Sequence, residues 1–444
     1  MYRKLLLTGS FLFWFLLLFL GIGFWTATGL AITLYYSVKV VLEMGHSIPI
    51  PDIMIALMGL QWVLGPRIEY INSFSHWKFK MYVEEPIYMS YVVPAIILFR
   101  VGLYIFPVKT DLKDLAHKVR LLNIEYPKLP YYMIAGGFIL PWIGTFFPPT
   151  LGFVFYLLGN LKYIGSIYLL FSPSKHRLLV FFSVMIFTAI SSIAIGMFHD
   201  LLLWGLLTFT FVAHELQFKW YTKVAMAITG IFLALTIQGV KSEFRDFTWR
   251  YGFEGNRTAL FISLASEAWQ TGSIVTPTKD GDMNMRLNQG WIISSVMNHV
   301  PEKEPYAEGE TIRDALYATL VPRILDPDKK IAGGRENFKR FTGQQISEGT
   351  SMGISLAGEG YANYGKYGGM IFMLIWGAFF GWFWQRIDKL GIYYPTILIW
   401  SPIIFLQVVK AETEFAVVLN HLIKSTLLVF GLLWAIKRYY GIRL

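Results

Sequence analysis

The sequence predicts an all-α polytopic membrane protein with about twelve transmembrane helices and one large, mostly helical extracytoplasmic loop. Of its 444 residues, 55% are hydrophobic and only 15% are charged, whereas an ordinary soluble domain carries about 25% charged residues. The apolar residues form blocks of the length that a helix needs to cross a bilayer, about 20 residues. Lipid offers no hydrogen-bond partner to an open backbone, so we expect these blocks to be helices.

The basic residues favour the same class. The chain has 39 Lys and Arg against 29 Asp and Glu, a net charge of +10, and such a charge also raises the question of nucleic acid. Here, however, most Lys and Arg occupy short loops between apolar blocks, which is the pattern of cytoplasmic loops. We therefore expect no nucleic-acid partner. The segment expected to be cytoplasmic contains Lys109, Lys113, Lys118, Arg120 and Lys128.

The apolar blocks set the expected spans and domains. Residues 5–41 are too long for one span, and Gly21 and Gly23 offer a turn between two. The other expected spans are 52–66, 86–106, 131–148, 150–171, 177–196, 200–214, 220–239, 366–385, 391–409 and 417–437. Alternation from the segment 109–128 puts both termini in the cytoplasm. The chain then divides into an N-terminal transmembrane bundle (1–239, about nine helices), a large periplasmic loop (240–365) and C-terminal transmembrane helices (366–444, about three).

The loop 240–365 is far longer than the few residues that connect two helices, so we expect it to carry the chemistry. Residues 256–270 are predicted to form an amphipathic helix on the membrane surface. Two more short helices are predicted at 287–300 and 311–320, the second ended by Pro322. The alternative is a structural cap without chemistry.

Several enzyme classes are excluded by what the sequence lacks. Without cysteine, the chain forms no disulfide, thiolate metal site or cysteine nucleophile. It has no P-loop and no HExxH motif. Its eight histidines are scattered, so we expect neither a metal site nor a cofactor.

Arginines are concentrated in the loop. Guanidinium groups bind phosphate in a bidentate, geometrically fixed way, and a lipid diphosphate at the outer leaflet is a matching ligand. Solvated surface charge with acidic partners is the alternative, and it accounts for about half of them. The loop arginines are Arg245, Arg250, Arg257, Arg286, Arg313, Arg323, Arg335 and Arg340.

Three of these arginines have informative neighbours. Arg286 is followed by Asn288, Gln289 and Trp291, and amides beside an aromatic ring suit sugar recognition. Arg323 follows Pro322, which fixes the backbone there. Arg340 precedes the sequence Phe-Thr-Gly.

The end of the loop, residues 351–365, is rich in glycine and other small residues, which let a backbone or ligand approach closely. Glu359 is a lone carboxyl in this setting, beside the next apolar block. Desolvation raises the pKa of a carboxyl towards the range useful for a general base. The alternatives are that Glu359 caps the following helix or pairs with an arginine.

A polar stripe is predicted in the last span. Lys410, Glu414, His421 and Lys424 have the spacing of one helical face, at the same outer surface as the loop. Charges inside a span are costly and functional by default. Alternatively, Lys410 and Glu414 neutralise each other and Lys424 extends to the interface. Lys162, near the middle of its span, poses the same question.

The passage Gly358-Glu359-Gly360-Tyr361-Ala362-Asn363-Tyr364-Gly365 resembles the Gly-Glu-x-Tyr-x-Asn-Phe-Gly stretch of Wzy-type oligosaccharide repeat unit (O-antigen) polymerases, which are related to O-antigen ligases. Tyr364 stands where these proteins usually have Phe. Many spans and one large periplasmic loop before the last few spans are shared as well. The resemblance implies a multi-pass protein of the bacterial inner membrane.

The resemblance also implies an activity. Such enzymes transfer a growing glycan from undecaprenyl diphosphate to another lipid-linked repeat unit at the periplasmic face, without a metal or other cofactor. The implied partners are this lipid-linked oligosaccharide, membrane lipid, and flippase and chain-length regulator proteins. Glu359 is then expected to deprotonate the acceptor hydroxyl, and Arg286 and Arg323 to stabilise the departing diphosphate. The expected substrate-binding residues are Arg257, Asn288, Gln289, Trp291, Arg340, Tyr361, Asn363, Lys410, His421 and Lys424.

Two other functions stay open. A ligase would move finished glycan to another acceptor and would handle the same donor. A lipid-linked sugar transporter would need charged or broken helices at mid-membrane, and often internal repeats. Only Lys162 favours a transporter, and the large loop counts against it.

Overall fold

A computed structural model describes residues 2–72, 79–108, 110–272, 287–321, 326, 334–346 and 352–444. Within these residues the chain is helical throughout, and the sole β contact is one isolated bridge, Met44 with Ser47. The described part contains six helical segments long and apolar enough to cross a membrane, which are Glu85–Leu103, Pro149–Leu170, Arg177–Ile195, Trp220–Arg250, Ser355–Ile392 and Phe415–Tyr440. The predicted all-helical class is confirmed.

The surface of several helices is apolar as well. Leu179, Ile186 and Ile231 each expose more than half of their side-chain surface. A continuous apolar exterior of this kind is costly in water and neutral in lipid, since lipid tails are as apolar as leucine. The exterior is therefore that of a membrane protein.

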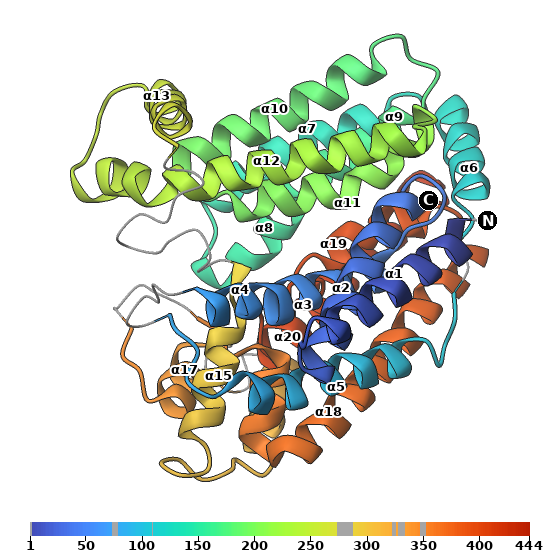
Figure 1. The fold of residues 1–444 in the computed structure, drawn as a ribbon. Helices are drawn as coiled ribbons and strands as arrows, with labels where there is room; N and C mark the ends of the chain where they lie inside the picture. The colour runs from blue at the N-terminus through green and yellow to red at the C-terminus, as the bar shows by residue number, and fades with distance from the viewer. Residues whose placement is uncertain are drawn as a thin grey trace.

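The helices form two layers (Figure 1). One layer begins with α1 and α2, which form an antiparallel pair around Gly21, whose positive φ of 77° makes the predicted turn. The helices that follow in this layer before residue 104 are short or moderate in length. Their bounds are α1 Tyr2–Phe19, α2 Phe24–Glu43, α3 Ile50–Gly59, η1 Leu60–Leu64, α4 Gly65–Ile71 and α5 Glu85–Leu103.

The second layer contains the middle of the chain and begins after α6, a helix whose first turn is capped by the side chain of Asp111. The helix predicted to end at 239 continues to Arg250, into the part assigned to the loop. The bounds are α6 Leu112–Glu125, α7 Leu129–Gly144, η2 Pro149–Leu151, α8 Gly152–Gly159, α9 Leu161–Leu170, α10 Arg177–Ile195, α11 His199–Glu215, α12 Trp220–Arg245 and η3 Asp246–Arg250.

The three helices predicted within the loop are present. Asn256 caps the first, because its side chain accepts hydrogen bonds from the backbone N–H groups of Thr258 and Ala259. A fourth short helix follows them. The bounds are α13 Arg257–Gln270, α15 Gly290–His299, α16 Glu310–Leu320 and α17 Arg335–Thr342.

The last part of the chain returns to the first layer. The predicted span 391–409 is wrong as a single helix, because its helical residues form only 3₁₀ turns and a five-residue helix. Ser401 begins that helix and Pro402 is its second residue, in the first turn, where a proline is tolerated. The bounds are α18 Ser355–Lys389, η4 Leu390–Ile392, η5 Ile397–Trp400, α19 Ser401–Phe405 and α20 Phe415–Tyr440.

Helix α18 packs along α5 through glycines. A Cβ added at Gly377 would lie 2.2 Å from the carbonyl oxygen of Phe99, and one at Gly381 would lie 2.3 Å from that of Leu103. Small residues spaced by four let two membrane helices approach at backbone distance. This contact fixes α18, and with it the predicted motif, against the first layer.

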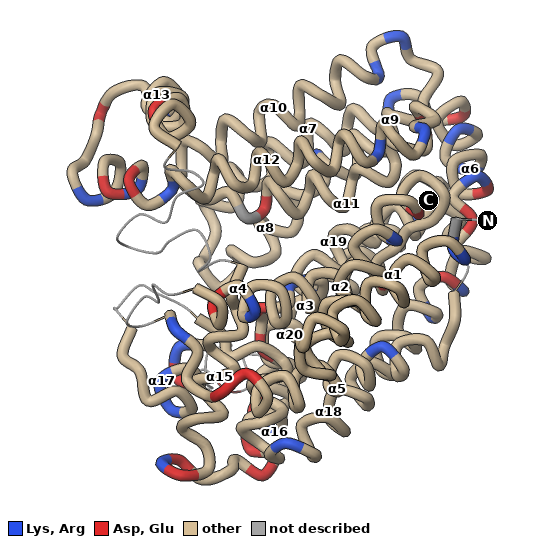
Figure 2. Tube along the Cα trace, in the orientation of Figure 1, with Lys and Arg blue, Asp and Glu red and all other residues tan. Residues whose placement is uncertain are grey.

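Both termini lie at one end of the molecule, which we call the termini end, and α13 and α15–α17 lie at the other, the cap end (Figure 1). Figure 2 shows Lys and Arg gathered on α6 and the neighbouring loops at the termini end, mixed charges at the cap end, and few charges on the helices between. Basic residues thus mark the end that carries both termini.

Candidate functional site

The motif that contains Glu359 forms a short helical segment of its own. At Gly365 the backbone leaves the helical region (φ 67°, ψ −165°), which divides α18 into Ser355–Tyr364 and a longer segment. The chain folds back sharply there, since a Cβ at Gly360 would lie 3.3 Å from the Cα of Gly369. A positive φ with this ψ is accessible to glycine alone, so Gly365 is needed for the break.

Glu359 is completely buried in the middle of this segment, with 0% of its surface exposed. Its Oε1 accepts a hydrogen bond from Thr311 Oγ1 of α16 at 2.7 Å, and its Oε2 accepts one from the backbone N–H of Phe415 at 2.7 Å. Phe415 is the first residue of α20. Glu359 therefore caps α20, and not its own helix or the following span as the alternative interpretation held.

Asn363 lies one turn after Glu359 and joins the same cluster. Its Nδ2 donates to Thr311 Oγ1 and to the carbonyl oxygen of Glu359, both at 2.8 Å, and its Oδ1 accepts from the N–H of Gly309 at 2.9 Å. Thr311 thus accepts from Asn363 and donates to Glu359. Two predicted residues meet here, while Thr311, which no sequence pattern singles out, connects them.

A second carboxyl, that of Glu414, lies directly beside this cluster. It precedes Phe415, is 1% exposed, and accepts a hydrogen bond from Asn337 Nδ2 of α17 at 3.3 Å. Burial, followed by the nearby charge of Glu359, raises the pKa of Glu414. Glu414 does not neutralise Lys410, whose nearest acidic partner is Asp200 at 3.9 Å.

Tyrosines hold the motif segment against α5. Tyr91 Oη donates to the carbonyl oxygen of Ala357 at 2.6 Å, and its ring meets the ring of Tyr361 edge-on at 5.1 Å. Tyr361 is half-buried by this packing. It lies in the same short segment as Glu359, but its ring packs against the rings of Tyr91 and Tyr306.

Arg340 is paired with acids. Its guanidinium contacts Glu304 at 2.5 Å and Glu310 at 3.0 Å. Glu310 precedes Thr311 at the start of α16, so this ion-pair group adjoins the Glu359 cluster. To bind a lipid diphosphate, Arg340 would have to release these two carboxylates.

The predicted substrate-binding residues around α15 contact other parts of the protein. Asn288 accepts a hydrogen bond from the N–H of Trp291 at 3.1 Å, and the backbone N–H of Gln289 donates to the carbonyl of Gln61 at 3.1 Å. Trp291 is 1% exposed and packs edge-on against Phe79 and against Phe338. These contacts leave no ring face open to a sugar. Arg286 and Arg323 lie outside the described residues.

Arg257 belongs to another part of the cap end. It begins α13, and its Nη1 donates to the carbonyl of Ala194 at 2.7 Å. Trp269 of the same helix stacks on Phe232 at 4.2 Å. This helix packs on α10 and α12 in a core of its own, separate from the core around Trp291.

The polar stripe predicted for the last span is only partly helical. Lys410 precedes α20, so it cannot share a helical face with His421 and Lys424, and that prediction is wrong. His421 Nε2 contacts the carbonyl of Ile403 at 2.9 Å, and the Lys424 ammonium lies 5.4 Å from the ring centre of Phe153. These residues face α8 and α19, whereas Glu359 meets α20 from α18.

An apolar groove of about 580 Å³ adjoins the Glu359 cluster. Each of the three helices that line it contributes a neighbour of the cluster: Ile312 follows Thr311, Tyr364 follows Asn363, and Phe415 donates to Glu359. From there the groove follows α18 to Phe379. The groove thus lies beside the buried carboxyls, neither of which lines it, and along the apolar flank of a candidate membrane span.

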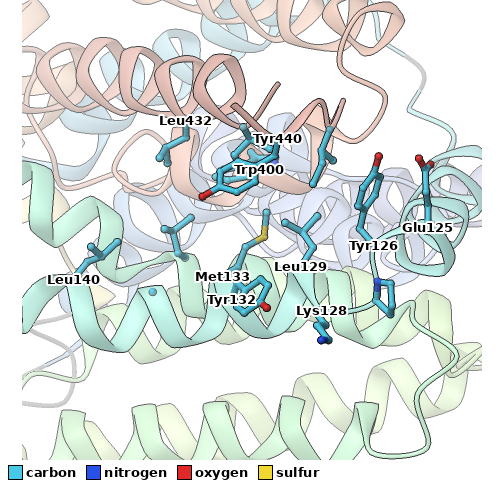
Figure 3. A pocket seen from close by; sticks show the side chains of 15 residues that line it. Glu125, Tyr126, Lys128, Leu129, Tyr132, Met133, Leu140, Trp400, Leu432 and Tyr440 are labelled. Atoms are coloured by element: carbon cyan, nitrogen blue, oxygen red, sulfur yellow. The ribbon is translucent and has the colours of Figure 1, made fainter. Parts of the chain in front are cut away.

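A larger cavity, of about 940 Å³, lies at the termini end. Figure 3 shows Leu129, Tyr132 and Met133 of α7 along one side and Trp400, Leu432 and Tyr440 along the other. None of the Glu359 cluster lines it. The polar chemistry and the larger cavity are thus in different places.

Comparisons of the chain with models of protein families, with curated proteins and with solved structures give no match. Within the described residues, no three His, Asp or Glu side chains are grouped as metal ligands. The two buried carboxyls at this site are those of Glu359 and Glu414.

Proposed function

We propose that this protein polymerises undecaprenyl-diphosphate-linked oligosaccharide repeat units at the periplasmic face of the bacterial inner membrane. The observation that carries the proposal is the buried carboxyl of Glu359, held by neutral donors and lying beside an apolar groove along α18. A carboxyl in such a setting can act as a base. The adjoining groove suits a donor that carries a long hydrocarbon chain.

The proposed topology has about twelve spans, with both termini in the cytoplasm. It is supported by the basic residues on α6 and the loops at the termini end. The other proposed spans are the helices α1, α2, α3 with α4, α7 and α11, and the broken segment around α19. The cap end, where Glu359 lies, is then periplasmic.

In the proposed reaction, Glu359 takes the proton of an acceptor sugar hydroxyl. The hydroxyl oxygen forms a bond to the anomeric carbon of the donor, while the bond from that carbon to the diphosphate oxygen breaks. Undecaprenyl diphosphate leaves with the bonding electrons. Arg286 and Arg323 are proposed to stabilise this leaving group, because guanidinium groups bind phosphate oxygens in pairs.

The test is incubation of the purified protein with a lipid-linked repeat unit, followed by gel analysis of product length. We expect a ladder of products from the natural sequence and none from Glu359→Gln. Glu302→Gln serves as the matched control, because Glu302 is exposed at the cap end. Equal ladders from the natural sequence and Glu359→Gln would remove Glu359 from the mechanism.

Deletion of the gene separates the rival functions. Cells should accumulate single repeat units if the protein is a polymerase, and long unattached chains if it is a ligase. Movement of lipid-linked sugar in proteoliposomes without elongation would instead identify a transporter.

A further inference from the structure

Two carboxyls from distant parts of the chain are buried side by side. Glu359 comes from α18 and Glu414 from the residue before α20, and neither exposes more than 1% of its surface. The N–H that binds Glu359 Oε2 belongs to Phe415, the residue directly after Glu414. Glu414 is therefore adjacent in the chain to the residue whose N–H binds Glu359.

No cation neutralises the pair within the described part of the chain. Neither carboxylate makes an ion pair there, and Arg340 of α17 is bound to Glu304 and Glu310. Arg335, at the start of the same helix, contributes no electrostatic interaction to Glu414. Lys410 has its electrostatic contacts with Asp200 and Glu412. The titratable or charged side chains nearest in sequence on the surrounding elements include Tyr91 of α5, Glu310, Arg313 and Asp314 of α16, Arg335, Glu336, Lys339 and Arg340 of α17, Tyr361 and Lys366 of α18, Lys410 and Glu412 of the coil before α20, and His421 and Lys424 of α20.

Two carboxylates without a cation cannot both ionise in a buried site at neutral pH, so one proton stays on the pair. The hydrogen bonds decide which oxygen carries it. Glu359 accepts from a hydroxyl and an N–H at 2.7 Å, and it lies at the N-terminus of a 26-residue helix. Both features favour its ionised form. Glu414 accepts only from one amide, at 3.3 Å.

We infer that Glu359 and Glu414 form a proton-sharing pair in which Glu414 carries the proton and keeps the site singly charged. Glu414 is a positioning residue in this arrangement, and its use in catalysis rests on the proposed function. In the reaction, the acceptor proton moves to Glu359, and the pair returns one proton to water after the product leaves. Ionisation of Glu414 would place a second negative charge beside the anionic donor and weaken donor binding.

The activity test compares pH profiles of Glu414→Gln and the natural sequence. In the natural sequence, we expect activity to fall at alkaline pH because the KM for the lipid-linked donor rises as Glu414 ionises. Glutamine cannot ionise, so Glu414→Gln should lose this alkaline limb of the profile and retain the acidic limb. Glu414→Asp should restore an alkaline limb. Movement of the acidic limb to lower pH by about one pH unit or more in Glu414→Gln would put the proton on Glu359 and overturn the assignment.

A second measurement needs no activity. Infrared spectroscopy of the purified protein detects the C=O stretch of a protonated carboxyl. We expect this band to be absent at neutral pH in Glu414→Gln. In Glu359→Gln the band should disappear at a lower pH than in the natural sequence, because Glu414 then has no charged neighbour. A band unchanged in both variants would overturn the pair.

These readouts separate the inference from the proposed function. A band that behaves as expected in a protein that elongates no glycan supports the pair and removes the polymerase. Elongation that needs Glu359, together with an unchanged band, supports the polymerase and removes the pair. Should Glu414→Gln fail to fold, the band in Glu359→Gln still decides.

Discussion

The two ends of this molecule differ in the partners of a buried carboxylate. At the termini end, the side chain of Glu215 is 5% exposed and is held by Arg120 of α6 and Arg177 of α10 at 2.6 and 2.7 Å. At the cap end, Glu359 is held only by a hydroxyl and a backbone N–H. Glu215 is paired with two cations, whereas Glu359 accepts hydrogen bonds from neutral donors.

This difference separates a structural from a reactive role. Two arginines pair with Glu215 and tie three helices together, and removal of one partner of such a group leaves uncompensated charge. Neutral donors orient Glu359 without neutralising it, so it can still accept a proton. Under the proposed function, the lack of a cationic partner within the described residues, and not burial alone, distinguishes Glu359 from Glu215.

The largest expected effect is on activity. Glu359→Gln should lower elongation by about 10²- to 10⁴-fold, the usual contribution of a positioned base. Glu215→Gln should leave the activity of the folded protein within about twofold, because Glu215 lies at the opposite end. Gel analysis of product length on both purified variants measures this. Comparable losses in the two variants would abolish the distinction between the two ends.

The next effect concerns stability. Glu215→Ala leaves Arg120 and Arg177 without their shared carboxylate, and since these arginines are 47% and 31% exposed, water compensates part of the loss. We expect a decrease of about 1–2 kcal/mol in the free energy of unfolding, between the values for exposed and buried pairs. Thermal unfolding in detergent measures it. A variant as stable as the natural sequence would show that this group joins the helices only weakly.

Features that depend on local pattern can be predicted from the sequence. The turn at Gly21, the cap at Asn256 and the helices α13, α15 and α16 follow from glycine, side-chain oxygen and helical periodicity within a few residues. The break of the predicted span 391–409 does not follow from hydropathy, because an apolar run has the same hydropathy whether its backbone forms one α-helix or short 3₁₀ and α turns.

The site depends on contacts between distant segments, and these are harder to predict. Small residues around Glu359 predict a buried carboxyl in this motif, and it is buried. Nothing local relates Thr311 or Glu414 to Glu359, because they lie 48 and 55 positions away in the chain. Spacing alone places Lys410 on a helix, but the helix begins only at Phe415.

A smaller effect is the dependence of stability on pH. The folded-state pKa of Glu414 is raised above its ordinary value of 4.5. The stability that protonated Glu414 contributes is then fully present below pH 4.5 and is lost as the pH rises through the folded-state pKa. We expect Glu414→Gln to flatten this decline, by about 1.4 kcal/mol for each pH unit that separates the two pKa values. Thermal unfolding across the pH range measures it, with Glu302→Gln as control, and parallel curves for both variants would contradict it.

The smallest effect isolates one neutral donor of the reactive carboxyl. Thr311→Val removes the hydroxyl that donates to Glu359 Oε1 and accepts from Asn363, while the valine keeps the shape of the side chain. Glu359 retains the N–H of Phe415, so the base is less well oriented but not lost. A hydrogen bond to a charged group contributes about 1.5–3 kcal/mol, and partial compensation leaves an expected loss in kcat/KM of about tenfold. Thr311→Ser restores the hydroxyl and should recover most of the activity. If valine and serine behave alike, the hydroxyl does not orient Glu359, and the backbone N–H at the start of α20 is then the donor that does.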